Sequence, residues 1–373
     1  MINLHDKDTS STPAGGYWTE KEIHQQPALW EKSVQNVRNQ QSALNEFLQP
    51  LLQRPNLRIL FSGAGTSAFA GEVLAPHLAG CTGRRFDAVS TTDIVASPDL
   101  YLAEKVPTLL VSFARSGCSP ESVATVQLVD QLLPESWHLV LTCNPEGTLF
   151  RNFQQRQDSY CLLMPEGSND KGFAMTSSFT CMMLSALCIF TPDSQFAEQA
   201  GKLQAHSESL LRNNADAPMD IPDRLIFLGS GPLNGIAREA ALKCLELTAG
   251  AINCSYDSPL GFRHGPKSAI NEKTTIIVFL NNRRHTRQYD LDLLSEIRRE
   301  NQAMNIVALD FSDTLDESID GAWLAFPCIL YAQQLAFNFS WRLGITPDNP
   351  CPSGEVNRVV QGVTIYPYEQ ADF

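Results

Sequence analysis

The stretch LFSGAGTSAFAG, residues 60–71, decides the fold because it joins an apolar strand to a glycine-rich turn and a helix start. Gly63, Gly65 and Ala68 have the spacing of a dinucleotide-binding turn, and Asp87 lies where a ribose-binding acid would be expected. The same turn can hold one phosphate at the start of a helix. The motif alone therefore leaves a dinucleotide and a simpler phosphate compound as alternatives.

The strand and its turn occur twice in the chain. Three pairs of apolar segments are related by an offset of 166 or 167 residues: LRILFSGAG (57–65) with DRLIFLGSG (223–231), PTLLVSF (107–113) with TTIIVFL (274–280), and WHLVLTC (137–143) with MNIVALD (304–310). Helical patterns alternate with these segments, which is typical of βαβ units. We predict an α/β chain of two tandem doubly wound, flavodoxin-like domains, each a three-layer α/β/α sandwich with a parallel sheet.

The remaining segments set the expected boundaries. Residues 19–53 have helical patterns, and Thr19 and Glu22 have the spacing of a capping box at the first helix. Pro, Asn and Asp cluster in 213–223, which favours a linker there. We predict three parts: an N-terminal tail and helix over 1–40, a first domain over 41–212, and a second domain over 213–373.

Composition narrows the class of protein. The 373 residues carry a net charge of −13 and show no basic stripe, which argues against a nucleic-acid partner. Ten cysteines without a C-x-x-C pair indicate a reduced chain without disulfides. The N-terminus lacks an apolar signal-peptide core, and no apolar run is long enough to span a membrane. We expect a cytoplasmic protein without membrane contact. The histidines lack metal-ligand spacing, so no metal site is expected.

Two hydroxyl-rich turns follow strands of the first repeat. Neighbouring turns at one sheet edge converge, so their hydroxyls and helix N-terminal amides can surround one phosphate. The candidate phosphate ligands are Gly65, Thr66, Ser67, Arg115, Ser116, Gly117 and Ser119, with Ser112 beside them. The alternative is that the serines only cap helices, as Ser119 would before Pro120. The second repeat has no serine-rich turn after its second strand, so we expect one phosphate site per chain.

The second repeat contains a helix with a charged face, AREAALKCLELTAG (237–250). Glu239, Lys243 and Glu246 are spaced i, i+4 and i+7 and therefore share one face. The opposite face, with Ala240, Leu242 and Leu245, is expected to pack inward. From spacing alone, Glu239 and Lys243 could equally be an ordinary helical ion pair.

At this point the chain resembles the sugar isomerase (SIS) domain family. GAGTS, ARSGCS and GFAMTSSFT (172–180) are similar to its motifs, and two tandem copies would cover roughly 40–373. The resemblance implies a phosphosugar ligand, with Thr66, Ser67, Ser116 and Ser119 at phosphate-binding positions. Arg115 stands where Gln is frequent. The third loop adds Thr176 and Ser177 as sugar-binding candidates.

The helix over 237–250 is also similar to one in the isomerase half of glucosamine-6-phosphate synthase. This likeness implies that Glu246 is the base that moves a proton between C1 and C2, and that Glu239 and Lys243 organise it. The motif HGP implies that His264 opens the sugar ring from a neighbouring subunit. The protein would then be a homodimer or higher homo-oligomer with a shared active site. Such aldose–ketose chemistry requires no cofactor.

The C-terminal segment is similar to the tail that closes over the sugar in the synthase. Gln361 stands where the synthase has a lysine that bonds covalently to the ketose. Because an amide cannot form a Schiff base, Gln361 is a candidate for sugar contact only, which argues against synthase chemistry.

Three segments are most similar to the AgaS group of tandem SIS enzymes: TEKEIHQQPALW (19–30), HGPKS (264–268) and CPSGEVNRVVQGVTIYP (351–367). This likeness implies conversion of galactosamine 6-phosphate to tagatose 6-phosphate and ammonia. Two alternatives stay open. One is a tagatose-6-phosphate ketose/aldose isomerase without deamination, and the other is a non-catalytic phosphosugar-binding regulator.

Overall fold

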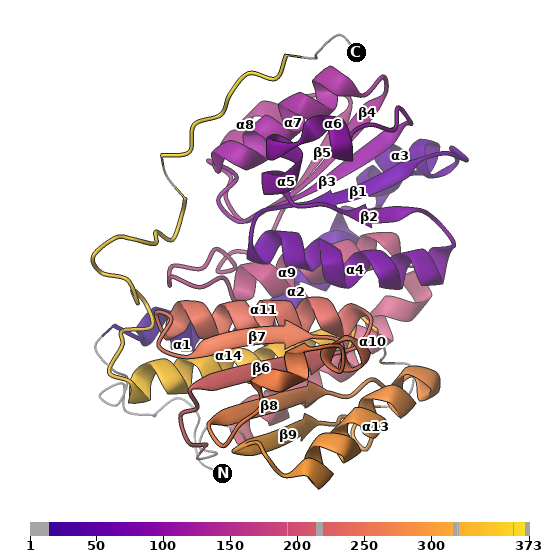
Figure 1. Ribbon diagram of the computed structural model, residues 1–373. Helices are drawn as coiled ribbons and strands as arrows, with labels where there is room; N and C mark the ends of the chain where they lie inside the picture. Colours follow the sequence, from indigo (N-terminus) through magenta and orange to yellow (C-terminus); the bar gives the residue numbers. More distant parts are fainter. Residues whose placement is uncertain are drawn as a thin grey trace, which may run out of the picture.

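The computed structural model describes residues 15–191, 193–213, 219–315, 319, 321–360 and 362–369. The chain forms two parallel sheets with helices packed between and around them (Figure 1). Three helices precede the first strand: α1 (Tyr17–His24), α2 (Gln26–Asn39) and α3 (Gln41–Leu52).

The first sheet has five parallel strands in the order β2-β1-β3-β4-β5. They are β1 (Arg58–Ser62), β2 (Phe86–Ala88), β3 (Thr108–Ala114), β4 (Ser136–Thr142) and β5 (Ser159–Leu163). The helices of this part are α4 (Thr66–Thr82), α5 (Thr91–Ala96), α6 (Pro98–Tyr101), α7 (Pro120–Leu132), α8 (Thr148–Phe153), α9 (Ser177–Phe190) and α10 (Asp193–Asn213).

The second sheet repeats the same order with four parallel strands, β7-β6-β8-β9. They are β6 (Arg224–Gly229), β7 (Asn253–Asp257), β8 (Thr274–Phe279) and β9 (Asn305–Leu309). Its helices are α11 (Pro232–Leu247), α12 (Pro259–Phe262), the short 3₁₀ helix η2 (Pro266–Ala269), α13 (Arg284–Glu300) and α14 (Ala325–Arg342).

The predicted α/β fold and its repeat are confirmed. All six segments paired in the sequence are parallel strands, and β1 matches β6 in position within its sheet. The first sheet has the flavodoxin strand order, and the second has the same order without a fifth strand. The two sandwiches pack face to face, because α4 under the first sheet packs on α11 over the second, and one central core spans both halves (Figure 1).

Strand residues alternate between two cores on opposite faces of each sheet. Phe61 on β1 and Phe227 on β6 both face the shared central core. Their neighbours face the outer helices instead: Leu60 packs in a core with α5, α7 and α8, and Ile226 packs in one with α12 and α13. The central core covers the inner face of each sheet and the outer helices cover the other face. Both faces of a central strand such as β1 or β6 therefore carry apolar residues.

The predicted capping box at Thr19 was wrong. Helix α1 begins at Tyr17, and Thr19 is already inside it. The carboxylate of Asp348 accepts hydrogen bonds from the backbone N–H groups of Trp18 (3.1 Å) and Thr19 (2.7 Å). The first turn is therefore capped by a residue 329 positions away, which a local pattern does not reveal.

After α14 the chain runs back along the outside of the molecule to the first sheet (Figure 1). Residues 350–360 and 362–369 form no helix or strand. Among the described residues, no helix is both long and apolar enough to cross a membrane.

Candidate active site

The first site lies where the chain leaves β1 and β3, the point at which the connections depart to opposite faces of the sheet. A cavity of about 240 Å³ opens there. Gly65 adopts φ +55° ahead of α4, a conformation that favours glycine, and α7 begins at Pro120 as predicted. Six predicted phosphate ligands line the cavity: Gly65, Ser67, Arg115, Ser116, Gly117 and Ser119. We call this cavity the phosphate cup.

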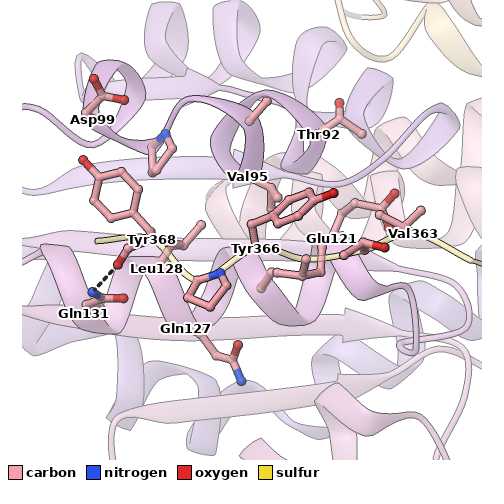
Figure 2. Close-up of a pocket in the computed structure, with 16 residues that line it drawn as sticks. Thr92, Val95, Asp99, Glu121, Gln127, Leu128, Gln131, Val363, Tyr366 and Tyr368 are labelled. Carbon is pink, nitrogen blue, oxygen red and sulfur yellow. Dashed lines mark hydrogen bonds between the residues drawn. The ribbon is translucent and has the colours of Figure 1, made fainter. Parts of the chain in front are cut away.

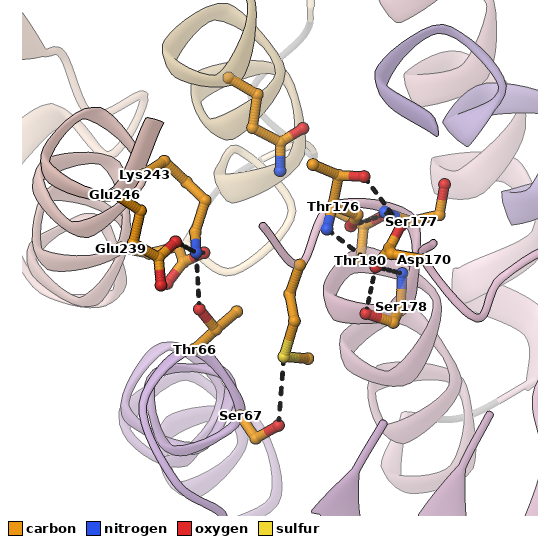
Figure 3. A network of polar contacts seen from close by, with 12 residues as sticks. Thr66, Ser67, Asp170, Thr176, Ser177, Ser178, Thr180, Glu239, Lys243 and Glu246 are labelled. Atoms are coloured by element: carbon orange, nitrogen blue, oxygen red, sulfur yellow. Dashed lines mark hydrogen bonds and ion pairs between the residues drawn. The ribbon is translucent and has the colours of Figure 1, made fainter. Parts of the chain in front are cut away.

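Four other predicted residues do not line the cup. Ser112 is buried in β3, and the Thr66 hydroxyl accepts a hydrogen bond from Lys243 Nζ. Thr176 and Ser177 are fully buried at the start of α9, where their backbone N–H groups each donate 2.9 Å hydrogen bonds to the Asp170 carboxylate (Figure 3). The Thr176 hydroxyl also donates to Asp170, so this loop is held by an internal anion.

Asp87, the acidic residue that a dinucleotide site would need for the ribose, is engaged by two arginines. The Asp87 carboxylate accepts hydrogen bonds from Arg58 Nε at 2.6 Å and Arg85 Nε at 3.1 Å. Arg58 is itself buried in β1. Asp87 therefore neutralises two arginines of the sheet edge instead of facing a ribose.

A buried lysine joins the first half of the chain to the second (Figure 3). Lys243 Nζ on α11 donates to the Thr66 hydroxyl at 2.9 Å, in the first turn of α4. It also forms a close ion pair with Glu246 and lies 3.4 Å from a Glu239 oxygen. Lys243 and Glu239 are fully buried, whereas the Glu246 side chain is 24% exposed. The predicted charged face is thus a contiguous cluster with one member open to a ligand.

Burial controls the charges of this cluster. Desolvation raises the pKa of Glu239 to about 8, although the Lys243 ammonium opposes the shift. Burial also disfavours the charged form of Lys243, but the adjacent carboxylates outweigh it and its pKa is raised. The positive charge of Lys243 is therefore retained and lies in direct contact with Glu246.

The predicted orientation of α11 was wrong for two of its leucines. Ala240 is buried as expected, but Leu245 is 42% exposed and Leu242 is half-buried. The charged face packs inward instead, because it meets the polar start of α4. Leu242 and Leu245 line a second cavity of about 580 Å³ with Phe173, Val356 and Glu246. The Glu246 carboxylate therefore borders a largely apolar space.

His264 lies apart from both cavities within its own chain. It is exposed in the turn between α12 and η2, and it lines neither the phosphate cup nor the cavity beside Glu246. Gln361 lies outside the described residues.

Sequence reasoning missed two polar side chains that contact the loop at residues 170–172. Arg358 lines the phosphate cup from the C-terminal tail, and its guanidinium donates to the carbonyls of Asp170 and Gly172. The Glu22 carboxylate of α1 accepts from the N–H groups of Lys171 (2.5 Å) and Gly172 (3.0 Å). Arg358 stands in a motif that resembled the AgaS tail, but nothing in its spacing indicated the loop that it contacts.

The second half has the same turn without an open cup. Gly231 has φ +59° and ψ −129°, close to the +55° and −127° of Gly65. Beyond this turn, the buried Asp290 carboxylate accepts hydrogen bonds from the Ser230 hydroxyl (2.5 Å) and the Asn281 N–H (3.0 Å). A side-chain carboxylate from α13 therefore bridges the residue before this turn and the segment that follows β8.

Comparison with known proteins agrees with this geometry. Residues 51–192 match the SIS domain. D-galactosamine-6-phosphate deaminase AgaS of Escherichia coli is 46% identical, with 97% of this chain and 98% of the relative aligned. The protein of that name from Shewanella sp. (strain ANA-3) is 45% identical over 96% of this chain and 94% of its own length.

A solved structure agrees over the same extent. The crystal structure of tagatose-6-phosphate ketose/aldose isomerase from Escherichia coli superposes with a TM-score of 0.87 at 45% identity, covering 96% of this chain and all of that one. Nearly full-length identity of this level means that the chain belongs to the SIS domain family and, within it, to the AgaS proteins.

Proposed function

We propose that this protein is an amino-sugar phosphate deaminase/isomerase that converts galactosamine 6-phosphate to tagatose 6-phosphate and ammonia. The observation that carries the proposal is the contact of Lys243 with both Thr66 and Glu246. Through Lys243, the Glu246 carboxylate is linked to the first turn of α4, whose Ser67 lines the phosphate cup. A sugar held by its 6-phosphate would then extend toward that carboxylate.

The proposed reaction transfers a proton from C2 to C1 of the substrate and then releases the amino group as ammonia. After ring opening, Glu246 removes the C2 proton while the C1 carbonyl oxygen gains a proton, which gives an enaminol. The proton returns to C1 and the nitrogen loses one, which leaves a 2-imino ketose. Water then adds at C2 and ammonia leaves. The Lys243 ammonium positions the Glu246 carboxylate by direct contact, and Glu239 holds Lys243 in place.

Ring opening is assigned to His264 of a neighbouring copy. Its exposure and its distance from both cavities of its own chain support this assignment. The active form would then be at least a homodimer with a shared active site, acting on a small phosphosugar without nucleic acid or membrane. The absence of a membrane-spanning helix among the described residues is compatible with a cytoplasmic enzyme.

The test is ammonia release from galactosamine 6-phosphate, compared with glucosamine 6-phosphate. We expect turnover of the galacto compound and loss of at least about 10³-fold in kcat for Glu246→Gln, because the base is removed while the shape is kept. Glu135→Gln, at an exposed ion pair with Arg54 far from the cup, is the matched control. Full activity of Glu246→Gln would refute the mechanism.

One alternative reaction has a specific observation in its favour, since the superposed crystal structure is named a tagatose-6-phosphate ketose/aldose isomerase. The same Glu246 chemistry would interconvert an aldose and a ketose without releasing nitrogen. Following tagatose 6-phosphate by a sugar-specific assay with ammonia measured in parallel separates the two reactions. Binding without any turnover would instead favour a phosphosugar-binding regulator.

A further inference from the structure

An arginine of the phosphate cup has an unused hydrogen-bonding group. Arg115 follows β3 and is 7% exposed. Its Nη2 donates to the backbone carbonyl of Arg358 at 2.6 Å, but its buried Nη1 has no hydrogen-bond partner. A buried guanidinium N–H without a partner carries a large desolvation cost. An anion in the cup would supply the missing acceptor.

A second guanidinium borders the same cavity. Arg358 Nε donates to the Gly172 carbonyl at 3.1 Å and its Nη2 donates to the Asp170 carbonyl. Among the described residues, its Nη1 forms no hydrogen bond, and neither Arg358 nor Arg115 forms an ion pair with a carboxylate. Both side chains line the cup.

The loop that holds Arg358 is rigidly supported. The Glu22 carboxylate binds the N–H groups of Lys171 and Gly172, and the Asp170 side chain binds the start of α9 (Figure 3). The loop that carries the two carbonyls contacted by Arg358 is therefore held in position by the buried carboxylates of Glu22 and Asp170. This role explains why Thr176 and Ser177 face Asp170 instead of the cup.

The charge balance favours an anionic ligand. Besides the two guanidiniums, the lining contains one carboxylate, that of Glu121. The positive charge of Arg358 contributes to lowering the pKa of Arg115, second to burial, so the two arginines repel each other across the cup. A phosphate dianion between them would remove this repulsion and accept charge-assisted hydrogen bonds.

Beyond Arg358 the tail is weakly fastened. Val363–Tyr368 cross over α5 and α7 and enclose a cavity of about 770 Å³ (Figure 2). The one hydrogen bond drawn there runs from Gln131 Nε2 to the Tyr368 carbonyl at 3.3 Å, and Tyr366 is 80% exposed. Three hydrogen bonds join residue 358 to the first half of the chain, whereas residues 362–369 are joined to it by the one from Gln131.

We propose that Arg115 and Arg358 form a two-arginine clamp for the substrate phosphate, so that the C-terminal tail itself supplies a phosphate ligand. The proposal rests on the proposed function in one respect, that the cup receives a phosphosugar. Arg115 joins the ligand to the tail because one guanidinium would contact the phosphate and also holds the carbonyl of residue 358.

Arg358→Gln tests the clamp, since this exposed side chain can be changed without opening the core. Asn357→Ala is the matched control, because the side chain of Asn357 is exposed and, among the described residues, its hydrogen bond goes to the Gly354 carbonyl within the tail. The probe is inorganic phosphate, with binding followed by calorimetry and exposure of residues 356–369 by hydrogen exchange. We expect phosphate to slow exchange of the tail in the wild type and in Asn357→Ala.

In Arg358→Gln, phosphate affinity should fall about 10- to 100-fold and tail protection should disappear. KM for the phosphosugar should rise while kcat changes far less, with partial rescue by Arg358→Lys. Wild-type phosphate affinity in Arg358→Gln would overturn the clamp, as would tail exchange that ignores phosphate.

These readouts do not depend on turnover. If phosphate binding requires Arg358 but no ammonia or ketose is formed, the proposed function fails and the clamp stands. If ammonia release is intact and KM is unchanged in Arg358→Gln, the clamp fails and the proposed function stands.

Discussion

At the residue scale, the charge of the cluster on α11 depends on Glu239, a buried carboxyl whose pKa is raised to about 8. Within the described part of the chain, neither side-chain oxygen of Glu239 accepts a hydrogen bond, and one of them lies 3.4 Å from Lys243 Nζ. Its raised pKa favours the protonated form of Glu239 near neutral pH. The close ion pair of Lys243 is therefore the one with Glu246. A neutral residue of the same shape should therefore replace Glu239 with little loss near neutral pH.

Glu239→Gln should change how stability depends on pH. The folded-state pKa of about 8 exceeds the ordinary value of 4.5, so the native state binds this proton more tightly. That stabilisation is complete below pH 4.5 and is lost as pH rises through 8. Relative to Glu239→Gln, the wild-type free energy of unfolding should decline between pH 5 and 8.5 by on the order of a few kcal/mol.

Denaturant unfolding of both proteins at matched pH values measures this difference. Parallel curves for the two proteins across that range would show that Glu239 is ionised throughout in the native state.

At the scale of elements, each half needs a glycine where its first strand meets its first helix. A Cβ on Gly63 would lie 2.6 Å from the Ser67 backbone carbon, and one on Gly229 would lie 2.4 Å from the Leu233 carbonyl oxygen. Both contacts are far below van der Waals distance. This close approach brings α4 and α11 tightly against their strands, which sets the depth of the cup.

Gly63→Ala should cost about 1–3 kcal/mol through overpacking and should also weaken phosphate binding, since Ser67 must move. Gly80→Ala, inside α4, is the control: its Cβ would meet nothing within 4 Å, and the higher helix propensity of alanine should stabilise the variant by up to about 1 kcal/mol. Thermal unfolding monitored by circular dichroism gives both values. Equal melting temperatures for the two variants would contradict the packing argument.

Local patterns predicted these elements well and their contacts poorly. The β-rich segments and both turns were correctly placed because strand periodicity and glycine spacing are local signals. The inward face of α11 was misjudged because Lys243 is buried by Thr66, 177 positions earlier in the chain. Asp348 and Arg358 act on segments 329 and 186 positions away, so no spacing rule could have found them.

At the scale of the whole molecule, the packing of α4 on α11 brings the two halves together at the site. The first half supplies the phosphate cup and the second supplies Glu246, so neither half holds a complete set of predicted groups. His264, exposed in the turn between α12 and η2, is proposed to act in a site of another copy.

Co-expression of Glu246→Gln with His264→Ala tests that assignment. If each site takes its base from one copy and its histidine from another, a purified mixed dimer contains one intact site and one doubly altered site. Its activity should recover to about half that of the wild-type dimer, although both parents are inactive. A mixed dimer as inactive as its parents would place His264 outside a shared site.

The Asp290 carboxylate marks a difference between the two repeats. Ser230 and Asn281 bind it just beyond a turn that keeps the dihedral angles of its counterpart at Gly65. The second copy thus carries an internal carboxylate near the turn whose counterpart in the first copy borders the proposed phosphate site. With that turn bridged internally, the second copy needs no ligand there, and its helix α11 can present the proposed base, Glu246, to a sugar bound by the first copy.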